Sequence, residues 1–109
     1  MKVFFLSIVL LLLLQTTRAQ VSYTWNGSLS ASWTTTGNWS PNGVPGALDD
    51  VRIVTAANNC MLTAGTTINN ITLASGTLDL NGGTLTVNGA TAVFTSGTVQ
   101  NGNLIVSAA

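Results

Sequence analysis

The stretch that decides the fold is Ser75–Val106, and within it the run SGTLDLNGGTLTVNG from Ser75 to Gly89. A short phrase returns three times, as Gly76-Thr77-Leu78, Gly83-Thr84-Leu85 and Gly97-Thr98-Val99. The first two phrases are each closed by an Asn-Gly pair, Asn81-Gly82 and Asn88-Gly89. Short apolar runs separated by Gly and Asn turns are typical of strands. The repetition therefore predicts an all-β chain that coils, with a surface or scaffold role.

Apolar residues recur every seven positions through this stretch. One set is Ile71, Leu78, Leu85, Ala92, Val99 and Val106, and a second set follows two positions later at Leu73, Leu80, Val87 and Phe94. A heptad normally suggests a coiled coil, but Gly, Thr and Asn fill the other positions, and Gly costs a helix about 1 kcal/mol relative to Ala. Residues at i and i+2 share one face of a strand. Each unit is therefore predicted to be one strand with inward apolar residues, followed by a corner of Gly or Asn where positive φ is often required.

Three such units make one coil of a β-solenoid of about 21 residues, here termed the long coil. The solenoid repeats are predicted over 51–109, with Val51–Val54 as the first strand. The long coil stacks Leu78 on Val99, Leu73 on Phe94 and Leu85 on Val106. A short coil of about 19 residues, which stacks Leu85 and Val87 on Leu104 and Val106, is an alternative. An antiparallel meander is the second structural alternative, because Asn-Gly also favours hairpins.

The N-terminal residues have the order of a secretory signal peptide. Lys2 precedes an apolar run from Val3 to Leu14, which only Ser7 interrupts, and a polar stretch leads to Ala19. The run is too short for a helix that spans a bilayer, which needs about 20 residues. We therefore predict a signal-peptide helix over 1–19 that is cleaved after Ala19, a secreted or cell-surface location, and no stable membrane span after cleavage.

Charged residues make up only 6% of the chain, against roughly 25% in typical soluble domains. After the predicted cleavage, Arg52 remains against Asp49, Asp50 and Asp79, which gives a net charge of 1 − 3 = −2. One cation cannot follow a phosphate backbone, so a nucleic-acid partner is excluded. The cleaved chain also has no His, Glu or Lys, the usual general acids, bases and amine nucleophiles. We expect no enzyme activity, no catalytic residue and no cofactor.

Cys60 is the single cysteine, so no intramolecular disulfide is possible. We expect it to be a small buried hydrophobic residue, and pairing with another molecule is the alternative. The pair Asp49-Asp50 is a conceivable Ca²⁺ ligand, but that ion takes six to eight oxygens and no other carboxylate lies nearby in the sequence. We therefore expect no metal, and a solvated turn in which Asp50 pairs with Arg52 or caps backbone N–H groups.

Residues 20–50 hold every tryptophan and the one tyrosine, namely Tyr23, Trp25, Trp33 and Trp39. Their spacing has no helical period and fits short strands and turns. A terminal solenoid repeat must cover its apolar cross-section, and large rings suit that purpose. The segment is therefore predicted to be a tryptophan-rich N-terminal cap. The alternative is that the four aromatic residues contact carbohydrate, because flat ring faces match the apolar faces of sugars.

The aromatic segment also resembles a known group of proteins. The residues that carry the resemblance are Trp25-Asn26-Gly27, Trp33, Gly37-Asn38-Trp39, Val44-Pro45-Gly46 and Asp49-Asp50-Val51-Arg52-Ile53. This order is similar to the opening segment of Bacteroidetes-type surface and adhesin-like proteins and of autotransporter-like β-solenoid proteins. The resemblance covers about Tyr23–Ile53 and implies that a right-handed parallel β-helix follows the signal peptide.

The expected function is that of a non-catalytic N-terminal part of a secreted cell-surface protein, a structural stalk or adhesin-like β-solenoid. Its expected partners are surface polysaccharide or other cell-surface components. The alternative is the N-terminal part of a secreted carbohydrate-binding or polysaccharide-degrading β-helix protein. Because the pattern stops at Ala109 without a closing cap, we also expect the chain to be an N-terminal fragment of a longer protein.

Overall fold

The computed structural model of the chain describes residues 19–107, so the signal peptide predicted for the N-terminus lies outside the described residues except for Ala19. The strands are β1 (Ser22–Trp25), β2 (Trp39–Ser40), β3 (Asp50–Ile53), β4 (Cys60–Met61), β5 (Thr66–Ile68), β6 (Ile71–Leu73), β7 (Thr77–Asp79), β8 (Thr84–Val87), β9 (Ala92–Phe94), β10 (Thr98–Gln100) and β11 (Asn103–Val106). One short 3₁₀ turn, η1 (Thr36–Asn38), precedes β2. Between residues 19 and 107 no helix is long and apolar enough to cross a bilayer.

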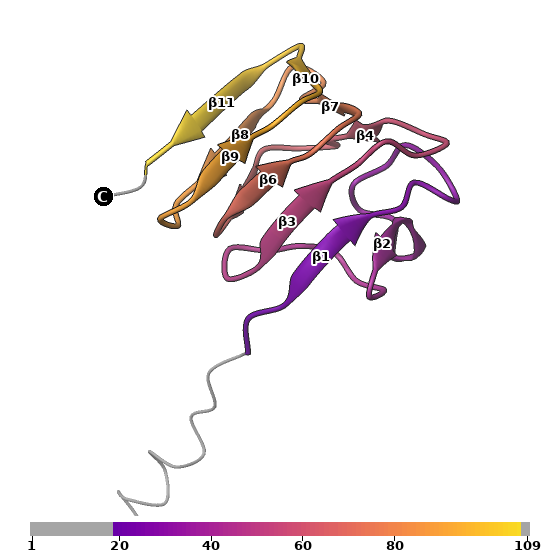
Figure 1. Cartoon of the computed structure of the whole chain (residues 1–109), viewed down its shortest axis with the longest axis horizontal. Helices are drawn as coiled ribbons and strands as arrows, with labels where there is room; N and C mark the ends of the chain where they lie inside the picture. Colours follow the sequence, from indigo (N-terminus) through magenta and orange to yellow (C-terminus); the bar gives the residue numbers. More distant parts are fainter. Residues whose placement is uncertain (1–18, 108–109) are drawn as a thin grey trace, which may run out of the picture.

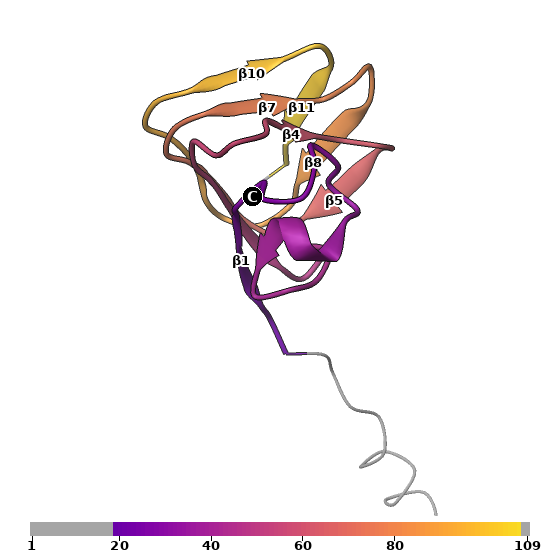
Figure 2. The same ribbon diagram turned by 90° about the vertical axis from the view of Figure 1, so that its right-hand side faces the viewer.

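Within this range the strands form three sheets. Sheet A has the order β2-β1-β3-β6-β9, sheet B the order β10-β7-β4, and sheet C the order β11-β8-β5. Figure 1 shows β1, β3, β6 and β9 side by side, and Figure 2 shows the sheets as sides around a common interior. All of these neighbours run parallel except β1 and β2. The predicted all-β, parallel arrangement is confirmed, and the antiparallel meander is excluded because β7 and β8 lie in different sheets.

From β3 onward the chain visits sheets A, B and C in turn, and one such passage is here termed a circuit. The first circuit is β3–β5, the second β6–β8 and the third β9–β11. Strand β1 already pairs with β3 in parallel, with Tyr23 opposite Val51. Sheet A therefore begins inside the aromatic segment, well before the strand predicted to be its first.

The offset between successive circuits differs from sheet to sheet. Val99 pairs with Leu78 in sheet B and Phe94 with Leu73 in sheet A, as the long coil requires. In sheet C, the pairing of β8 with β11 has the offset that the short coil predicts. Between the second and third circuits, the offsets of both predicted coil lengths therefore occur in one molecule. Between the first and second circuits, the offset is 71 − 51 = 20 in sheet A and 78 − 60 = 18 in sheet B.

In sheet C the predicted stacking of Leu85 on Val106 is wrong. Leu104 pairs with Leu85, and Val106 pairs with Val87. The cause is the length of one corner: positions 80–83 join β7 to β8, whereas only positions 101–102 join β10 to β11. The shorter corner shortens the third circuit by the same amount.

The interior is filled by residues that alternate along the strands. The buried apolar side chains are Tyr23, Trp25, Trp33, Trp39, Val51, Ile53, Cys60, Leu62, Ile68, Ile71, Leu73, Leu78, Leu80, Leu85 and Val87. The corners use left-handed backbone as predicted, with φ of +50° at Asn81 and +62° at Asn101, and of +80° at Gly76 and +96° at Gly97. The apolar pairs and the Gly and Asn corners thus have the roles that the sequence pattern predicts.

The third circuit is not covered by other described residues. Phe94 is 46% exposed, whereas Leu73, its partner in the second circuit, is 2% exposed. Val106 is 47% exposed and its partner Val87 is fully buried. Within residues 19–107, β9, β10 and β11 are each the last strand of their sheet. Their three free edges lie on the side of the molecule away from β1 and β2 (Figure 1).

Candidate functional site

The four predicted aromatic residues gather around Trp39 at the N-terminal end of the molecule. The rings of Trp33, Trp25 and Tyr23 meet that of Trp39 at centroid distances of 4.8, 5.0 and 6.3 Å, each in an edge-to-face arrangement. All four residues are buried. A sugar platform needs an exposed ring face, so in this structure the cluster packs the core and offers no surface to a carbohydrate.

Polar atoms of the cluster are mostly satisfied inside the protein. The Trp39 Nε1–H donates to the Trp33 carbonyl at 2.8 Å, and the Trp25 Nε1–H donates to the Asn58 carbonyl at 2.9 Å. The Trp33 Nε1 is buried and has no hydrogen-bond partner among residues 19–107. Two indoles thus fix the course of the backbone around them, which is a structural role.

Asn38 organises the loop that carries these rings. It is fully buried, and its Oδ1 accepts hydrogen bonds from the backbone N–H groups of Leu29 (2.9 Å) and Ser30 (3.0 Å). Its Nδ2 donates to the Ser30 Oγ and to the Ser32 carbonyl, both at 2.9 Å. In the sequence, Asn38 stood out only as one of the residues that carry the resemblance, because a buried amide that serves four partners has no local signature.

The two adjacent aspartates have separate roles. Asp49 is fully buried, and its carboxylate accepts hydrogen bonds from the backbone N–H groups of Val21 (3.1 Å) and Gly46 (2.9 Å). Asp50 accepts a hydrogen bond from the Asn69 Nδ2 at 3.0 Å. The predicted solvated turn is therefore wrong for Asp49, which does the backbone capping expected of Asp50. Asp50 meets Asn69 and not Arg52.

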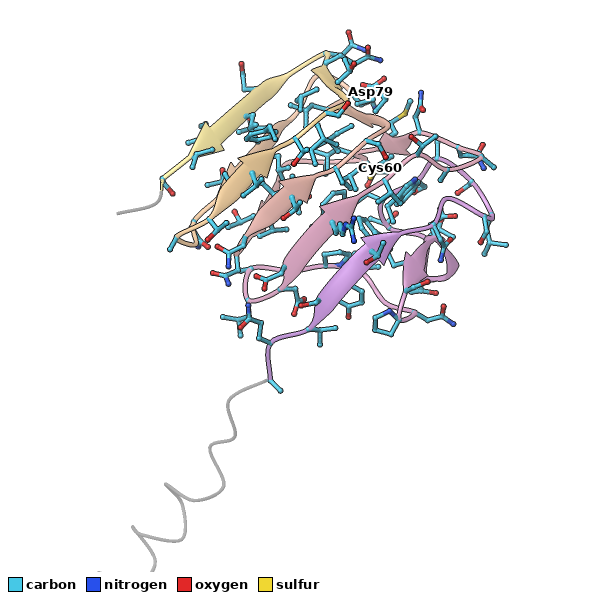
Figure 3. All side chains as sticks on the ribbon, viewed as in Figure 1. Cys60 and Asp79 are labelled. Carbon is cyan, nitrogen blue, oxygen red and sulfur yellow. The ribbon has the colours of Figure 1, made fainter. Side chains whose placement is uncertain are left out.

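No metal centre is assembled from these side chains. In the part of the chain that the structure describes, no three His, Cys, Asp or Glu residues lie close enough together to hold an ion. Cys60 is fully buried in β4, next to Leu78 of β7 (Figure 3). Burial raises the pKa of the Cys60 thiol, so the reactive thiolate is disfavoured. The prediction that Cys60 is a small buried hydrophobic residue is confirmed.

A hollow of about 270 Å³ lies on the outer face of sheet A. It is lined by Ser22, Tyr23, Thr24, Asp50, Val51, Arg52 and Thr72. Because Tyr23 and Val51 point inward, their strand neighbours point outward. The outward set combines three hydroxyl groups, one carboxylate and one guanidinium. The sequence did not single out this set, since its residues meet only through the parallel pairing of β1, β3 and β6.

Asp79 forms a second polar group, at the corner that follows β7 (Figure 3). Its Oδ1 accepts a hydrogen bond from the Asn81 backbone N–H at 2.8 Å, and its Oδ2 accepts from the Asn101 Nδ2 at 3.2 Å. The Gln100 Nε2 lies 3.5 Å from the same Oδ2. The hydrogen bond from Asn81 is the main cause that lowers the pKa of Asp79 from its ordinary value, with desolvation opposing it and the two side-chain amides adding to it. The carboxylate thus ties the second circuit to the third.

The fold defines the class of this molecule as an all-β protein built on parallel sheets. The chain belongs to a family described as "Domain of unknown function (DUF8693)", whose model matches residues 24–108. The matched range runs from within β1 to just beyond β11. Comparison with curated proteins found no match, and neither did comparison with solved structures.

Proposed function

We propose that the three circuits are the start of a right-handed parallel β-helix, that the aromatic segment is its N-terminal cap, and that the chain is a structural, non-catalytic part of an exported cell-surface protein. The observation that carries this proposal is the repeated stacking of inward apolar residues. Leu78 lies between Cys60 and Val99 in sheet B, and Ile71 between Val51 and Ala92 in sheet A. Each circuit buries the apolar face of the one before it, as in a solenoid.

The placement of the reactive side chains supports a structural role. Asp49 caps backbone N–H groups, Asp79 joins two corners and Cys60 is packed in the interior. Residues 20–109 hold no His, Glu or Lys to serve beside them in acid–base or nucleophilic chemistry. These three side chains are thus engaged in hydrogen bonds or packing within the protein.

Export is the part of the proposal that rests on residues 1–19. The chain carrying a C-terminal epitope tag is expressed in a bacterial host, and the protein outside the cytoplasm is analysed by intact-mass spectrometry. We expect a product that begins at Gln20 and is digested by protease added to intact cells. The matched control is Leu11→Arg, which interrupts the apolar run and should leave the chain unprocessed inside the cell. An unprocessed wild-type chain in the cytoplasm contradicts the proposal.

Carbohydrate binding is the second candidate function, and the hollow on sheet A favours it. Its one carboxylate and one guanidinium balance in charge, and hydroxyl groups surround them. Such a set can donate to and accept from the neighbouring hydroxyl groups of a sugar without preference for an ionic ligand. The hollow therefore supports this function at Asp50 and Arg52, and of the four aromatic residues only Tyr23 belongs to its lining.

Titration calorimetry against a panel of neutral polysaccharides tests this second function. We expect binding to be lost in Arg52→Ala and retained in the control Thr86→Ala, which changes an outward residue of sheet C. The tryptophan emission should not change on binding, because the four rings are buried. Binding that survives in Arg52→Ala, or an absence of binding across the panel, counts against a carbohydrate site in the hollow.

A further inference from the structure

The hollow on sheet A is crossed by two rows of outward side chains that run from strand to strand. One row is Thr24 of β1, Arg52 of β3 and Thr72 of β6, since Arg52 pairs with both threonines in the parallel register. The other row places Ser22 of β1 beside Asp50 of β3. All of these side chains line the hollow, and β1, β3 and β6 lie side by side (Figure 1). The hollow therefore repeats its polar groups across the strands.

The two charged groups of the hollow keep hydrogen-bonding capacity for a ligand. Within residues 19–107 the Arg52 guanidinium has no hydrogen-bond or ion-pair partner, and a guanidinium carries five N–H donors. The Asp50 Oδ1 accepts from the Asn69 Nδ2 at 3.0 Å, which orients the carboxylate and leaves its second oxygen to a ligand. An oriented acceptor beside a set of unused donors suits hydroxyl groups, because a hydroxyl group both donates and accepts hydrogen bonds.

The spacing of these polar groups differs between the two directions of the sheet. Neighbouring strands lie about 4.8 Å apart, whereas outward residues two positions apart along one strand are separated by about 6.6 Å. Each sugar unit of an extended β-1,4-linked polysaccharide advances the chain by close to the first distance and by clearly less than the second. A chain that crosses the strands therefore presents one unit to each strand, whereas a chain that follows one strand falls out of step with its side chains.

We propose that the hollow binds an extended, β-linked neutral polysaccharide whose chain crosses the strands, with successive sugar units over β1, β3 and β6. This inference rests on the carbohydrate-binding function proposed for the hollow and adds the shape and direction of the ligand. Arg52 and Asp50 bind the central unit, as donor and acceptor. The hydroxyl groups of Thr24 and Thr72 contact the units on either side of it.

The size of the hollow agrees with a chain that lies along the face of the sheet. Its volume of about 270 Å³ is below the range of about 300–1,000 Å³ for pockets that enclose a small molecule. The hollow therefore accommodates only part of the ligand, and the chain continues beyond it in both directions. Affinity should accordingly depend on how many strands the ligand spans.

Titration calorimetry with oligosaccharides of increasing length tests this dependence. The probes are β-1,4-linked oligomers of glucose, xylose and mannose, from one to five units long. We expect the affinity of at least one series to rise with each unit up to three, the number of strands in the hollow, and then to level off. The matched control is the α-1,4-linked glucose series, which has the same units in a curved chain and should gain no affinity with length.

The two threonines test the direction of the chain. Thr24→Val and Thr72→Val each remove one hydroxyl group and should weaken binding of the three-unit ligand about fivefold, the loss expected for one neutral hydrogen bond. Thr86→Val, which makes the same change on the outer face of sheet C, should leave binding unchanged. Tryptophan emission checks that each variant is folded, and if Thr24→Val alters it, Thr72→Val decides the question.

The outcomes separate this inference from the carbohydrate function on which it rests. Binding that is lost in Arg52→Ala but unchanged in both threonine variants overturns the direction of the chain and retains the carbohydrate site. Equal binding of the two glucose series, or binding of a panel polysaccharide without binding of any β-1,4-linked series, overturns the proposed shape of the ligand alone. If no polysaccharide of the neutral panel binds, the carbohydrate function and this inference both fail.

Discussion

Asn38 is the residue that makes the most side-chain hydrogen bonds within the aromatic segment. Its amide group makes four hydrogen bonds to the loop over residues 29–32, and it is fully buried. Removing it leaves donors and acceptors of a partly buried loop without partners. The loop and the ring of Trp33 at its end would then lose their fixed position.

We predict that Asn38→Ala lowers the free energy of unfolding by about 2 kcal/mol, the cost expected when several partly buried polar groups lose their partner. Urea denaturation followed by tryptophan emission measures this change. Asn42→Ala is the matched control, because Asn42 is exposed in a nearby turn, and its effect should stay within about 0.5 kcal/mol. Equal effects of the two substitutions would show that the amide network does not stabilise the aromatic segment.

The hydrogen bonds of Asp79 lead to a prediction about how the stability of the fold depends on pH. Its hydrogen bonds lower its pKa in the folded protein, so folding favours the ionised form. A group of this kind contributes its stability above the ordinary pKa near 4, and the contribution is lost as pH falls through the lowered folded value. We therefore expect the chain to lose stability below about pH 4, and we expect Asp79→Asn to show a weaker loss over the same range.

The measurement for Asp79 is urea denaturation at about pH 6 and about pH 3 for both proteins, on either side of the ordinary carboxyl pKa. A carboxyl-carbon NMR titration of Asp79 reads the pKa itself. A midpoint at or above the ordinary value, or the same acid sensitivity in Asp79→Asn and wild type, would rule out a role for this carboxylate in joining the circuits.

Single residues also show where sequence reasoning reached its limit. Burial of Cys60 followed from its apolar neighbours, and the prediction is confirmed. Backbone capping was predicted for Asp50 and is found at Asp49, because one of its two donors, the Val21 N–H, lies 28 positions away in the sequence and reaches Asp49 only through the fold. The outward residues of the hollow come together through pairing between strands that lie far apart in the sequence, and no local pattern encodes that meeting.

At the scale of strands and corners, the corner glycines differ in what surrounds them. Gly76 has a φ of +80° and Gly82 a φ of +78°. A Cβ on Gly76 would lie 2.9 Å from the Val54 carbonyl oxygen, whereas a Cβ on Gly82 would meet nothing within 4 Å. Stacking of one corner on another thus confines Gly76, while Gly82 projects into open space.

We predict that Gly82→Ala costs about 1 kcal/mol, which is the strain of left-handed backbone alone. Gly76→Ala should cost about 2–3 kcal/mol, because the backbone of the neighbouring corner must also move. The free energies of unfolding of the two variants, measured side by side, provide the comparison. A cost for Gly82→Ala that equals or exceeds that for Gly76→Ala would mean that the corners are not stacked as described.

The length of the corners also explains why the strands could be predicted from the sequence while the register between paired strands could not. The apolar pairs at i and i+2 identified the inward faces of β6, β7 and β8 correctly. The offset depends on corner length, and the corner at 101–102 is shorter than the corner at 80–83. Because Asn and Gly suit both lengths, composition alone left the long and the short coil as alternatives, and the strand pairs of the third circuit have both offsets.

For the whole molecule, the aromatic segment is the part in which the fold departs most from the expected division into cap and repeats. Strand β1 joins sheet A in parallel, and Ser32 bridges in parallel to Met61 of sheet B. The chain then turns back through η1 to β2, which is antiparallel to β1. The aromatic segment therefore begins like the other circuits, with contacts to sheets A and B, and turns back before it reaches sheet C.

Stacking of the chain in parallel circuits around one interior is the feature from which the proposed structural role follows. Backbone nuclear Overhauser contacts in the labelled chain test this stacking most directly. We predict contacts between Leu78 and Val99, in the register of the long coil, and between Leu85 and Leu104, in that of the short coil, in the same sample. Backbone contacts between Thr77–Asp79 and Thr84–Val87, which a hairpin through Asn81-Gly82 would bring together, would contradict it.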